Sequence, residues 1–183
     1  MDAIVGNPLR LKSVNHISLI CRSVDVTVAF YENVLGFVSI VRPGSFNFEG
    51  AWLFGHGIGI HLLKAEDPEK IPRKKEINTK DNHISFQARL IDFNSIHCRC
   101  DGSIDAVEKY LNDKKIVCKR ALVEENGIQV DQLFFHDPDG FMIEICNCDS
   151  LPVIPLAGEI VNSCSRINLE TMPQKIHQPV EKI

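Results

Sequence analysis

Three histidines and one glutamate lie in strand-like apolar stretches of this 183-residue chain. They are His16, His61, His83 and Glu144, and each sits beside aliphatic residues. Because the side chains of a strand alternate between its two faces, each ionisable group points away from the aliphatic neighbours that must pack in a core. Three imidazoles and one carboxylate suit a divalent ion such as Zn, Ni, Mn or Fe. The pattern therefore predicts a metal site built from these four residues.

An ordinary core role is the alternative, because a single histidine in a strand is more often a hydrogen-bonded core residue than a ligand. Repetition argues against it here, since the tetrapeptide NHIS occurs at 15–18 and again at 82–85. Glu144 stands between Ile143 and Ile145. A carboxylate in an apolar strand is strongly disfavoured unless it is paired, hydrogen-bonded or bound to a metal. Both features favour the metal site.

The elements that must position these residues follow the same order twice. Apolar runs and helical spacing predict a strand, a helix and three strands in the first half, at 14–21, 24–35, 37–41, 49–54 and 58–63. The same order returns in the second half at 82–88, 104–111, 116–123, 128–135 and 141–146. The last strand follows the turn Asp137-Pro138-Asp139-Gly140, which has the residues that a type I turn prefers. The chain is therefore predicted to be an α+β protein with two βαβββ modules.

This repeat also predicts how the chain is organised. The expected segments are an N-terminal extension at 1–13, a first module at 14–66, a linker at 67–81, a second module at 82–148 and a proline-containing tail at 149–183. Neither module alone can bury both faces of its sheet, so we expect 14–148 to form one domain. An unusual loop at 89–102 contains His97-Cys98-Arg99-Cys100, for which a solvated loop is favoured over a metal site.

Composition excludes several classes of partner. The formal charge of −4 and the pI near 6.0 provide no basic field for nucleic acid or an anionic membrane. No apolar run has the length of a membrane span or a signal peptide. The seven cysteines include two C-x-C pairs and no C-x-x-C, which indicates reduced thiols. We therefore expect a cytoplasmic protein that acts on a small molecule.

Two longer motifs resemble the vicinal oxygen chelate (VOC) superfamily. They are FYENVLGF at 30–37 and HDPDGFMIEI at 136–145, and together with the NHIS repeat they are similar to plant glyoxalase I-like (lactoylglutathione lyase-like) proteins. The resemblance implies the glyoxalase/bleomycin resistance/dioxygenase fold, in which two βαβββ modules form a curved, barrel-like mixed sheet. It also implies that the first and last strands of each module supply the metal ligands, which selects the same four residues.

The resemblance further implies a metal-dependent lyase or isomerase that polarises a carbonyl or hydroxycarbonyl substrate and moves an α-proton. For glyoxalase I the substrate is the hemithioacetal of methylglyoxal and glutathione, and a glutamate carries the proton. Glu144 and His61 are then the candidate catalytic residues. Trp52 and Phe54 are candidates for lining the substrate pocket, although ordinary packing explains them equally well. Superfamily members often build their sites between the modules of two chains, so a homodimer is expected.

One departure from glyoxalase I keeps other functions open. His61 stands where glyoxalase I has a carboxylate, so the site is more positive by about one charge and Glu144 is its only carboxylate. A glutathione-independent enzyme that dehydrates or aromatises a natural product is one alternative. An Fe(II) dioxygenase with His16, His83 and Glu144 as its ligand triad is another. A non-catalytic module that sequesters a ligand is the third. Surface charge is the role expected for Arg22, Arg42 and Lys64.

Overall fold

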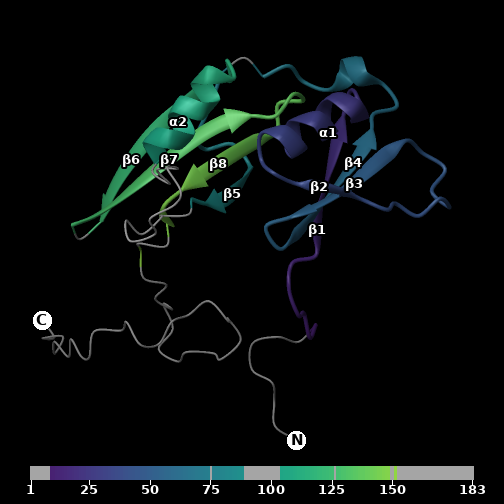
Figure 1. Cartoon of the computed structure of the whole chain (residues 1–183), viewed down its shortest axis with the longest axis horizontal. Coiled ribbons are helices and arrows are strands. Elements are labelled where there is room, and N and C mark those ends of the chain that lie inside the picture. The colour runs from purple at the N-terminus through teal and green to yellow at the C-terminus, as the bar shows by residue number, and fades with distance from the viewer. Residues whose placement is uncertain (1–8, 75, 89–103, 126, 149–150, 152–183) are drawn as a thin grey trace, which may run out of the picture. The chain divides into compact units, whose positions relative to one another are not determined.

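A computed structural model of the chain describes residues 9–74, 76–88, 104–125, 127–148 and 151 (Figure 1). The first half contains β1 (His16–Cys21), α1 (Val24–Asn33), β2 (Val38–Ile40), β3 (Gly50–Gly55) and β4 (Ile58–Lys64). A short 3-10 helix, η1 (Pro68–Lys70), precedes the second half. That half contains β5 (His83–Gln87), α2 (Ile104–Asp113), β6 (Cys118–Glu125), β7 (Ile128–His136) and β8 (Met142–Cys146). The βαβββ order predicted for each half is confirmed.

The ends of α1 follow local chemistry. Ser23 is extended, and its hydroxyl accepts a hydrogen bond from the Val26 backbone N–H, as an N-cap residue should. The helix ends at Asn33, two residues before the predicted end at 35. Gly36 then adopts a φ of +73°, a conformation that glycine reaches without steric cost. The chain thereby turns out of the helix and into β2.

Hydrogen bonds divide the strands into two four-stranded sheets, in the orders β1-β4-β3-β2 and β5-β8-β7-β6. In each sheet the first strand pairs in parallel with the last strand of its module, and the other pairs are antiparallel. The predicted α+β fold with mixed sheets is confirmed. Register places Ser18 beside His61 and Ser85 beside Glu144. The serine of each NHIS copy therefore adjoins the second ligand-type residue of its own module.

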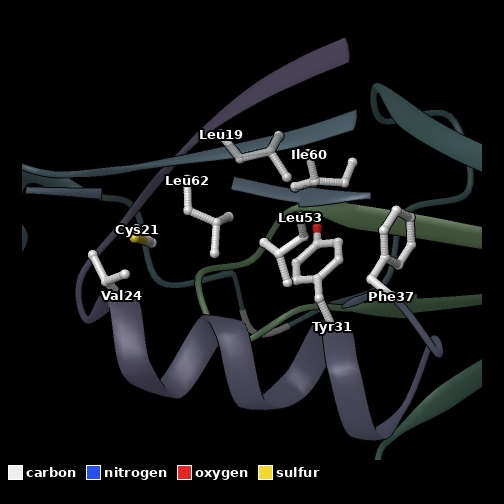
Figure 2. Close-up of a cluster of buried hydrophobic side chains, with 8 residues drawn as sticks. All are labelled: Leu19, Cys21, Val24, Tyr31, Phe37, Leu53, Ile60 and Leu62. Carbon is white, nitrogen blue, oxygen red and sulfur yellow. The ribbon is translucent and has the colours of Figure 1, made fainter. Parts of the chain in front are cut away.

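Each helix covers one face of its own sheet. In the first module, Tyr31 of α1 packs on Leu53, Ile60 and other apolar side chains that lie between the sheet and the helix (Figure 2). In the second, Leu111 of α2 belongs to the cluster that contains Leu133 and other apolar residues of β7 and β8. Full burial of one such side chain stabilises the fold by about 1.5–3 kcal/mol. The ligand-type residues are left on the opposite faces.

The turn before β8 joins the two modules through α1. The Asp139 carboxylate is buried and accepts hydrogen bonds from the Arg22 backbone N–H at 2.8 Å and the Thr27 hydroxyl at 2.7 Å. The Tyr31 hydroxyl donates to Asp137 at 3.3 Å. The Arg22 guanidinium also contacts Asp139 and the carbonyl oxygen of Ile71. The prediction that Arg22 is a solvated surface charge is therefore wrong, because its partner lies 117 positions away in sequence.

The cysteines differ from expectation in one place. Cys146 and Cys148 form a disulfide with a Cα–Cα distance of 5.4 Å, so the prediction of reduced thiols is wrong for this pair. The chain leaves β8 between them, and the bend brings both Cα atoms into disulfide range. Cys21 and Cys118 are free thiols.

Several expectations concern segments that the structure does not describe. The loop at 89–102 lies outside the described residues, as do most of the N-terminal extension and nearly all of the tail. One compact unit extends over Val14–Ser150. Within the described ranges, no helix is long and apolar enough to cross a membrane.

Candidate metal centre

The first sheet brings His16 and His61 together. Their rings stack with centroids 3.9 Å apart, on the adjacent strands β1 and β4. Gly59 leaves the space for this stack, since a Cβ there would lie only 3.1 Å from the Cβ of His16. Burial, and then the charge of His16, lower the pKa of His61. His61 is thereby held in the neutral form, which is the form that binds metal ions.

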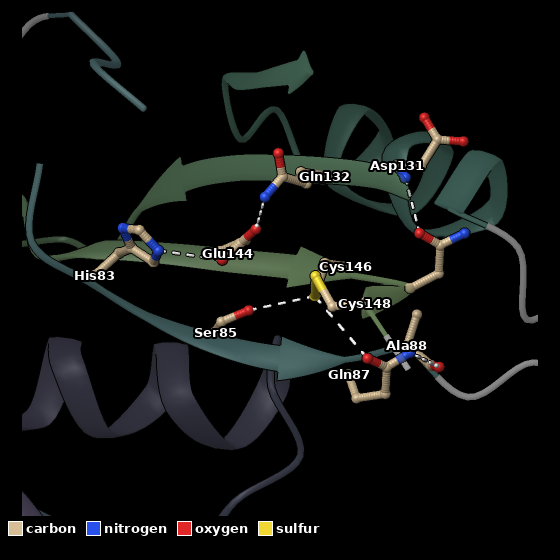
Figure 3. Close-up of a disulfide and its surroundings, with 10 residues drawn as sticks. His83, Ser85, Gln87, Ala88, Asp131, Gln132, Glu144, Cys146 and Cys148 are labelled. Carbon is tan, nitrogen blue, oxygen red and sulfur yellow. Dashed lines mark hydrogen bonds and ion pairs between the residues drawn. A yellow bond between two sulfur atoms is a disulfide. The ribbon is translucent and has the colours of Figure 1, made fainter. Parts of the chain in front are cut away.

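The second sheet brings His83 and Glu144 together. Nε2 of His83 lies 3.1 Å from Oε2 of Glu144, whose side chain is only 5% exposed (Figure 3). The other carboxylate oxygen, Oε1, accepts a hydrogen bond from the Gln132 side chain at 2.5 Å. Gln132 lies on β7, where register places Phe134 directly opposite Glu144. The buried carboxylate is therefore hydrogen-bonded on one side and faces an imidazole on the other.

The contacts of His83 indicate that a proton or a cation is needed between its ring and the Glu144 carboxylate. Nδ1 lies 2.8 Å from the carbonyl oxygen of Asp81, which can only accept, so Nδ1 carries the proton of a neutral ring. Nε2 then presents a lone pair to the carboxylate of Glu144. Two electron-rich atoms at 3.1 Å need a proton or a cation between them. A metal ion satisfies this requirement, and the fixed tautomer resembles that of metal-bound histidines.

The four predicted ligands form two pairs in separate sheets. Among the described residues, the one group of three or more ligand-type side chains of metal-site dimensions is Glu144 with Cys146 and Cys148. His16 therefore lies against His61, and His83 lies against Glu144. Among the described residues, the four side chains do not form one cluster.

A cavity of about 570 Å³ lies beside His16 and His61 on the first sheet. The Trp52 ring stacks on His61 with centroids 4.1 Å apart and an interplanar angle of 3°, because β3 and β4 place these residues in register. Much of the remaining wall is apolar, contributed by Ile40, Phe46, Phe48, Phe54 and Leu62. The two aromatic residues predicted for a pocket, Trp52 and Phe54, both line this cavity.

Other lining residues escaped the sequence-based prediction. Phe46 and Phe48 lie between β2 and β3, and the guanidinium of Arg42 lies 4.8 Å from each ring centroid. Arg42 also donates to the Phe48 carbonyl oxygen, so the expectation of a solvated surface charge is wrong for it. The sequence offered one signal for this part of the cavity wall, namely two phenylalanines, Phe46 and Phe48, close to Arg42. Lys64 does form an exposed ion pair with Glu49.

Large apolar side chains stay exposed around this cavity. Ile20, Val38 and Phe54 are 63%, 59% and 47% exposed. Strand alternation places Ile20 on the face of His16, and register sets Val38 opposite Phe54. Exposed apolar side chains beside a cavity are typical of a binding interface.

Comparisons with known proteins agree with the fold described above. The model of the Glyoxalase/Bleomycin resistance protein/Dioxygenase superfamily matches residues 13–99. The chain is 62% identical over 185 residues to Glyoxylase I 4 of Arabidopsis thaliana, covering 98% of this chain and 99% of the relative.

Two solved structures share the fold. A glyoxalase/dioxygenase from Nostoc punctiforme has a TM-score of 0.54 at 22% identity, covering 80% of this chain and 96% of that one. The second is a mutant of the fosfomycin resistance protein FosX from Listeria monocytogenes in complex with Mn(II). It has a TM-score of 0.55 at 16% identity, and the match covers 74% of this chain and 91% of that one. At these identities the likeness concerns the fold alone.

Proposed function

Because the chain belongs to the Glyoxalase/Bleomycin resistance protein/Dioxygenase superfamily, we propose that it is a glyoxalase I-like, metal-dependent lyase. Its substrate in this proposal is a small carbonyl or hydroxycarbonyl compound, with the methylglyoxal–glutathione hemithioacetal as the first candidate and glutathione as co-substrate. The 62% identity to Glyoxylase I 4 over nearly the whole chain carries the proposal. A cytoplasmic location, expected from the sequence, stays a prediction.

His16, His61, His83 and Glu144 are the residues that would hold the divalent ion, which we propose to be Zn, Ni, Mn or Fe. Two features support the fit: the pKa of His61 is lowered, and Nε2 of His83 lies 3.1 Å from the buried carboxylate of Glu144. When bound, the ion would supply Lewis-acid polarisation of the substrate oxygens.

Glu144 would move the proton in this mechanism. Gln132 holds Oε1 and thereby orients the carboxylate, so that Oε2 points toward His83. Burial shields this oxygen from water. Oε2 would accept a proton from one substrate carbon and return it to the neighbouring carbon. Trp52 and Phe54 line the cavity wall beside His61, where they would exclude water from the substrate.

A homodimer forms part of the proposal. The first module of one chain would meet the second module of its partner, so that each site receives one histidine pair and one His–Glu pair. The separation of the two pairs among the described residues supports this arrangement. The exposed Ile20 and Val38 beside the cavity support it as well, because a partner surface would cover them.

The cavity favours a second candidate, a glutathione-independent enzyme that dehydrates or aromatises a natural product. None of the described residues that line the cavity is an arginine or a lysine. Glutathione carries two carboxylates, which such cationic side chains would bind. Aromatic walls from Phe46, Phe48 and Trp52 suit a larger apolar substrate instead.

The deciding experiment is metal analysis combined with turnover assays of a Glu144→Gln variant. We expect the wild-type protein to convert hemithioacetal, and the variant to lose roughly 10²-fold or more in kcat because the proton carrier is gone. Glu69→Gln, an exposed carboxylate of η1, is the matched control and should keep full activity.

The outcomes separate the candidates. Undiminished turnover by Glu144→Gln would refute the proposed role of the carboxylate. Turnover of α-hydroxycarbonyls without glutathione would favour the second candidate. A tightly bound ligand that is recovered unaltered would instead identify a sequestering module.

A further inference from the structure

A second group of ligand atoms lies at the end of β8. Glu144 and Cys146 are two residues apart on this strand, so their side chains share a face, and Cys148 follows directly after it. One carboxylate oxygen and the two sulfur atoms all lie within 4.8 Å of one another (Figure 3). Neither cysteine belongs to the four ligands of the proposed metal centre.

The backbone around the two cysteines is held in place. Asn147, the residue between them, accepts a hydrogen bond from the Asp131 N–H through its side chain at 2.7 Å and donates its own N–H to the Asp131 carbonyl at 3.3 Å. Two contacts with β7 therefore fix the bend that turns Cys148 back toward Cys146. This geometry is built by the fold and does not depend on the disulfide alone.

The surroundings of Cys146 are polar although its side chain is almost fully buried. Its sulfur lies 3.4 Å from the Ser85 hydroxyl and 3.9 Å from the Gln87 side-chain oxygen, both on β5. Cys148 is less buried than Cys146. One sulfur is thus enclosed among polar groups and the other is accessible from solvent, which gives an ion or an oxidant a route to the pair.

We propose that Cys146, Cys148 and Glu144 form a thiolate site for a soft divalent cation, such as Zn²⁺ or Cd²⁺, when the disulfide is reduced. Two thiolates and one carboxylate are a typical donor set for these ions, and a water molecule completes the tetrahedron. The site shares Glu144 with the proposed metal centre, but its sulfur ligands define it independently of glyoxalase activity.

Oxidation closes this site. The thiol groups of Cys146 and Cys148 lose two electrons and two protons as the S–S bond forms, and hydrogen peroxide takes these up and becomes two water molecules. Because metal ions bind thiolates and not disulfide sulfur, the cation is released. The disulfide in the structure is the closed state.

Cobalt titration of the reduced full-length protein tests the proposal. Co²⁺ bound to thiolate has a near-ultraviolet charge-transfer band, which histidine and carboxylate ligands do not produce. The background carries Cys98→Ser and Cys100→Ser, so that the other C-x-C pair contributes no sulfur. We expect the band to rise to saturation with added Co²⁺, to disappear on adding peroxide, and to return after reduction.

Single substitutions assign the ligands. Cys148→Ser should lower the band by about half or more, because one of two sulfur ligands is lost. Cys118→Ser removes a free thiol of β6 and should leave it unchanged. Glu144→Gln keeps both sulfurs, and should weaken the affinity while preserving the band.

A missing band, or one that survives Cys148→Ser unchanged, would overturn the proposal. Circular dichroism confirms that the variants are folded, and Cys148→Ala repeats the test with a second side chain. These readouts do not involve turnover, so loss of the band and failure of the proposed lyase activity are separate outcomes.

Discussion

At the scale of single residues, the chemistry depends on how each ionisable group is held. Glu144 is buried, its Oε1 accepts from Gln132, and its Oε2 faces His83 at 3.1 Å. The carbonyl oxygen of Asp81 accepts a hydrogen bond from Nδ1 of a neutral His83 ring. A proton or a cation is then needed between Nε2 of His83 and the Glu144 carboxylate. A buried carboxylate held in this way is suited to carry a proton between two substrate atoms.

Trp52 gives a prediction about substrate binding. Its ring covers His61 face to face and forms part of the cavity wall. We expect Trp52→Ala to raise KM for the proposed substrate by roughly tenfold or more, since a large apolar contact is lost, with a smaller effect on kcat. Trp52→Phe keeps an aromatic face and should retain most of the affinity. Steady-state kinetics of both variants would contradict this role if KM did not change.

Asp137 gives a prediction about pH. Burial raises the pKa of its carboxyl group above the ordinary value, so the folded protein binds this proton more tightly than the unfolded chain. The contribution of Asp137 to stability is therefore complete below about pH 4 and is lost as the pH rises through the raised pKa. The free energy of unfolding of the wild type, relative to Asp137→Asn, should decrease over this range.

Denaturant titrations at a series of pH values measure that difference. In the variant, the amide oxygen can still accept the backbone N–H bonds of Asp139 and Phe141, so the turn is retained. Asp113→Asn, at the exposed end of α2, is the control and should show no such slope. A constant difference between the wild type and Asp137→Asn would show that the carboxyl group titrates alike in both states.

At the scale of elements, strand pairing decides which residues meet. Parallel pairing aligns Ser18 with His61 in one sheet and Ser85 with Glu144 in the other. Antiparallel pairing then adds Trp52 beside His61 and Phe134 beside Glu144. A shift of one residue would move each ligand-type side chain to the helix-covered face, so the register is essential to both candidate sites.

Gly50 gives a prediction about this register. A Cβ at Gly50 would collide with the carbonyl oxygen of Leu62 on the neighbouring strand β4. Gly50→Ala should therefore destabilise the protein by about 1–3 kcal/mol and shift β3 against β4. Gly44→Ala is the control, because nothing lies within 4 Å of a Cβ there. Equal unfolding midpoints for the two variants would contradict the close approach.

At the scale of the whole molecule, the two modules supply different halves of the proposed centre. The first provides two stacked histidines and an apolar cavity, and the second provides His83 with the buried Glu144. In the proposed homodimer, a partner surface would cover the exposed apolar residues beside the cavity. A homodimer would supply this surface by symmetry, because each first module would meet the partner's second module.

Subunit complementation tests the shared site. His16→Ala and Glu144→Gln should each be inactive as homodimers. Refolding them together produces mixed dimers in which one of the two sites contains no substitution, so about a quarter of the wild-type activity should return. No recovery from properly refolded mixed dimers would place all four ligands within a single chain.

The sequence by itself determined the local features of the molecule. The repeated βαβββ order follows from apolar periodicity, from the N-cap Ser23 and from turn residues such as Gly140, all of which act over a few neighbouring positions. Strand alternation also separated the ligand-type residues from the core, which is why His16, His61, His83 and Glu144 were identified as candidates. Their role as metal ligands stays a prediction.

Only the tertiary structure decided which residues meet across long sequence distances. In the folded chain Trp52 stacks on His61, and Arg22 forms an ion pair with Asp139. Cys146 and Cys148 form a disulfide, and the four candidate ligands lie in two separate pairs. The physical reason is that periodicity specifies the face of an element, whereas partners depend on register, on bends between elements and on packing between modules. Those contacts form only when the whole chain is folded, so no local pattern contains them.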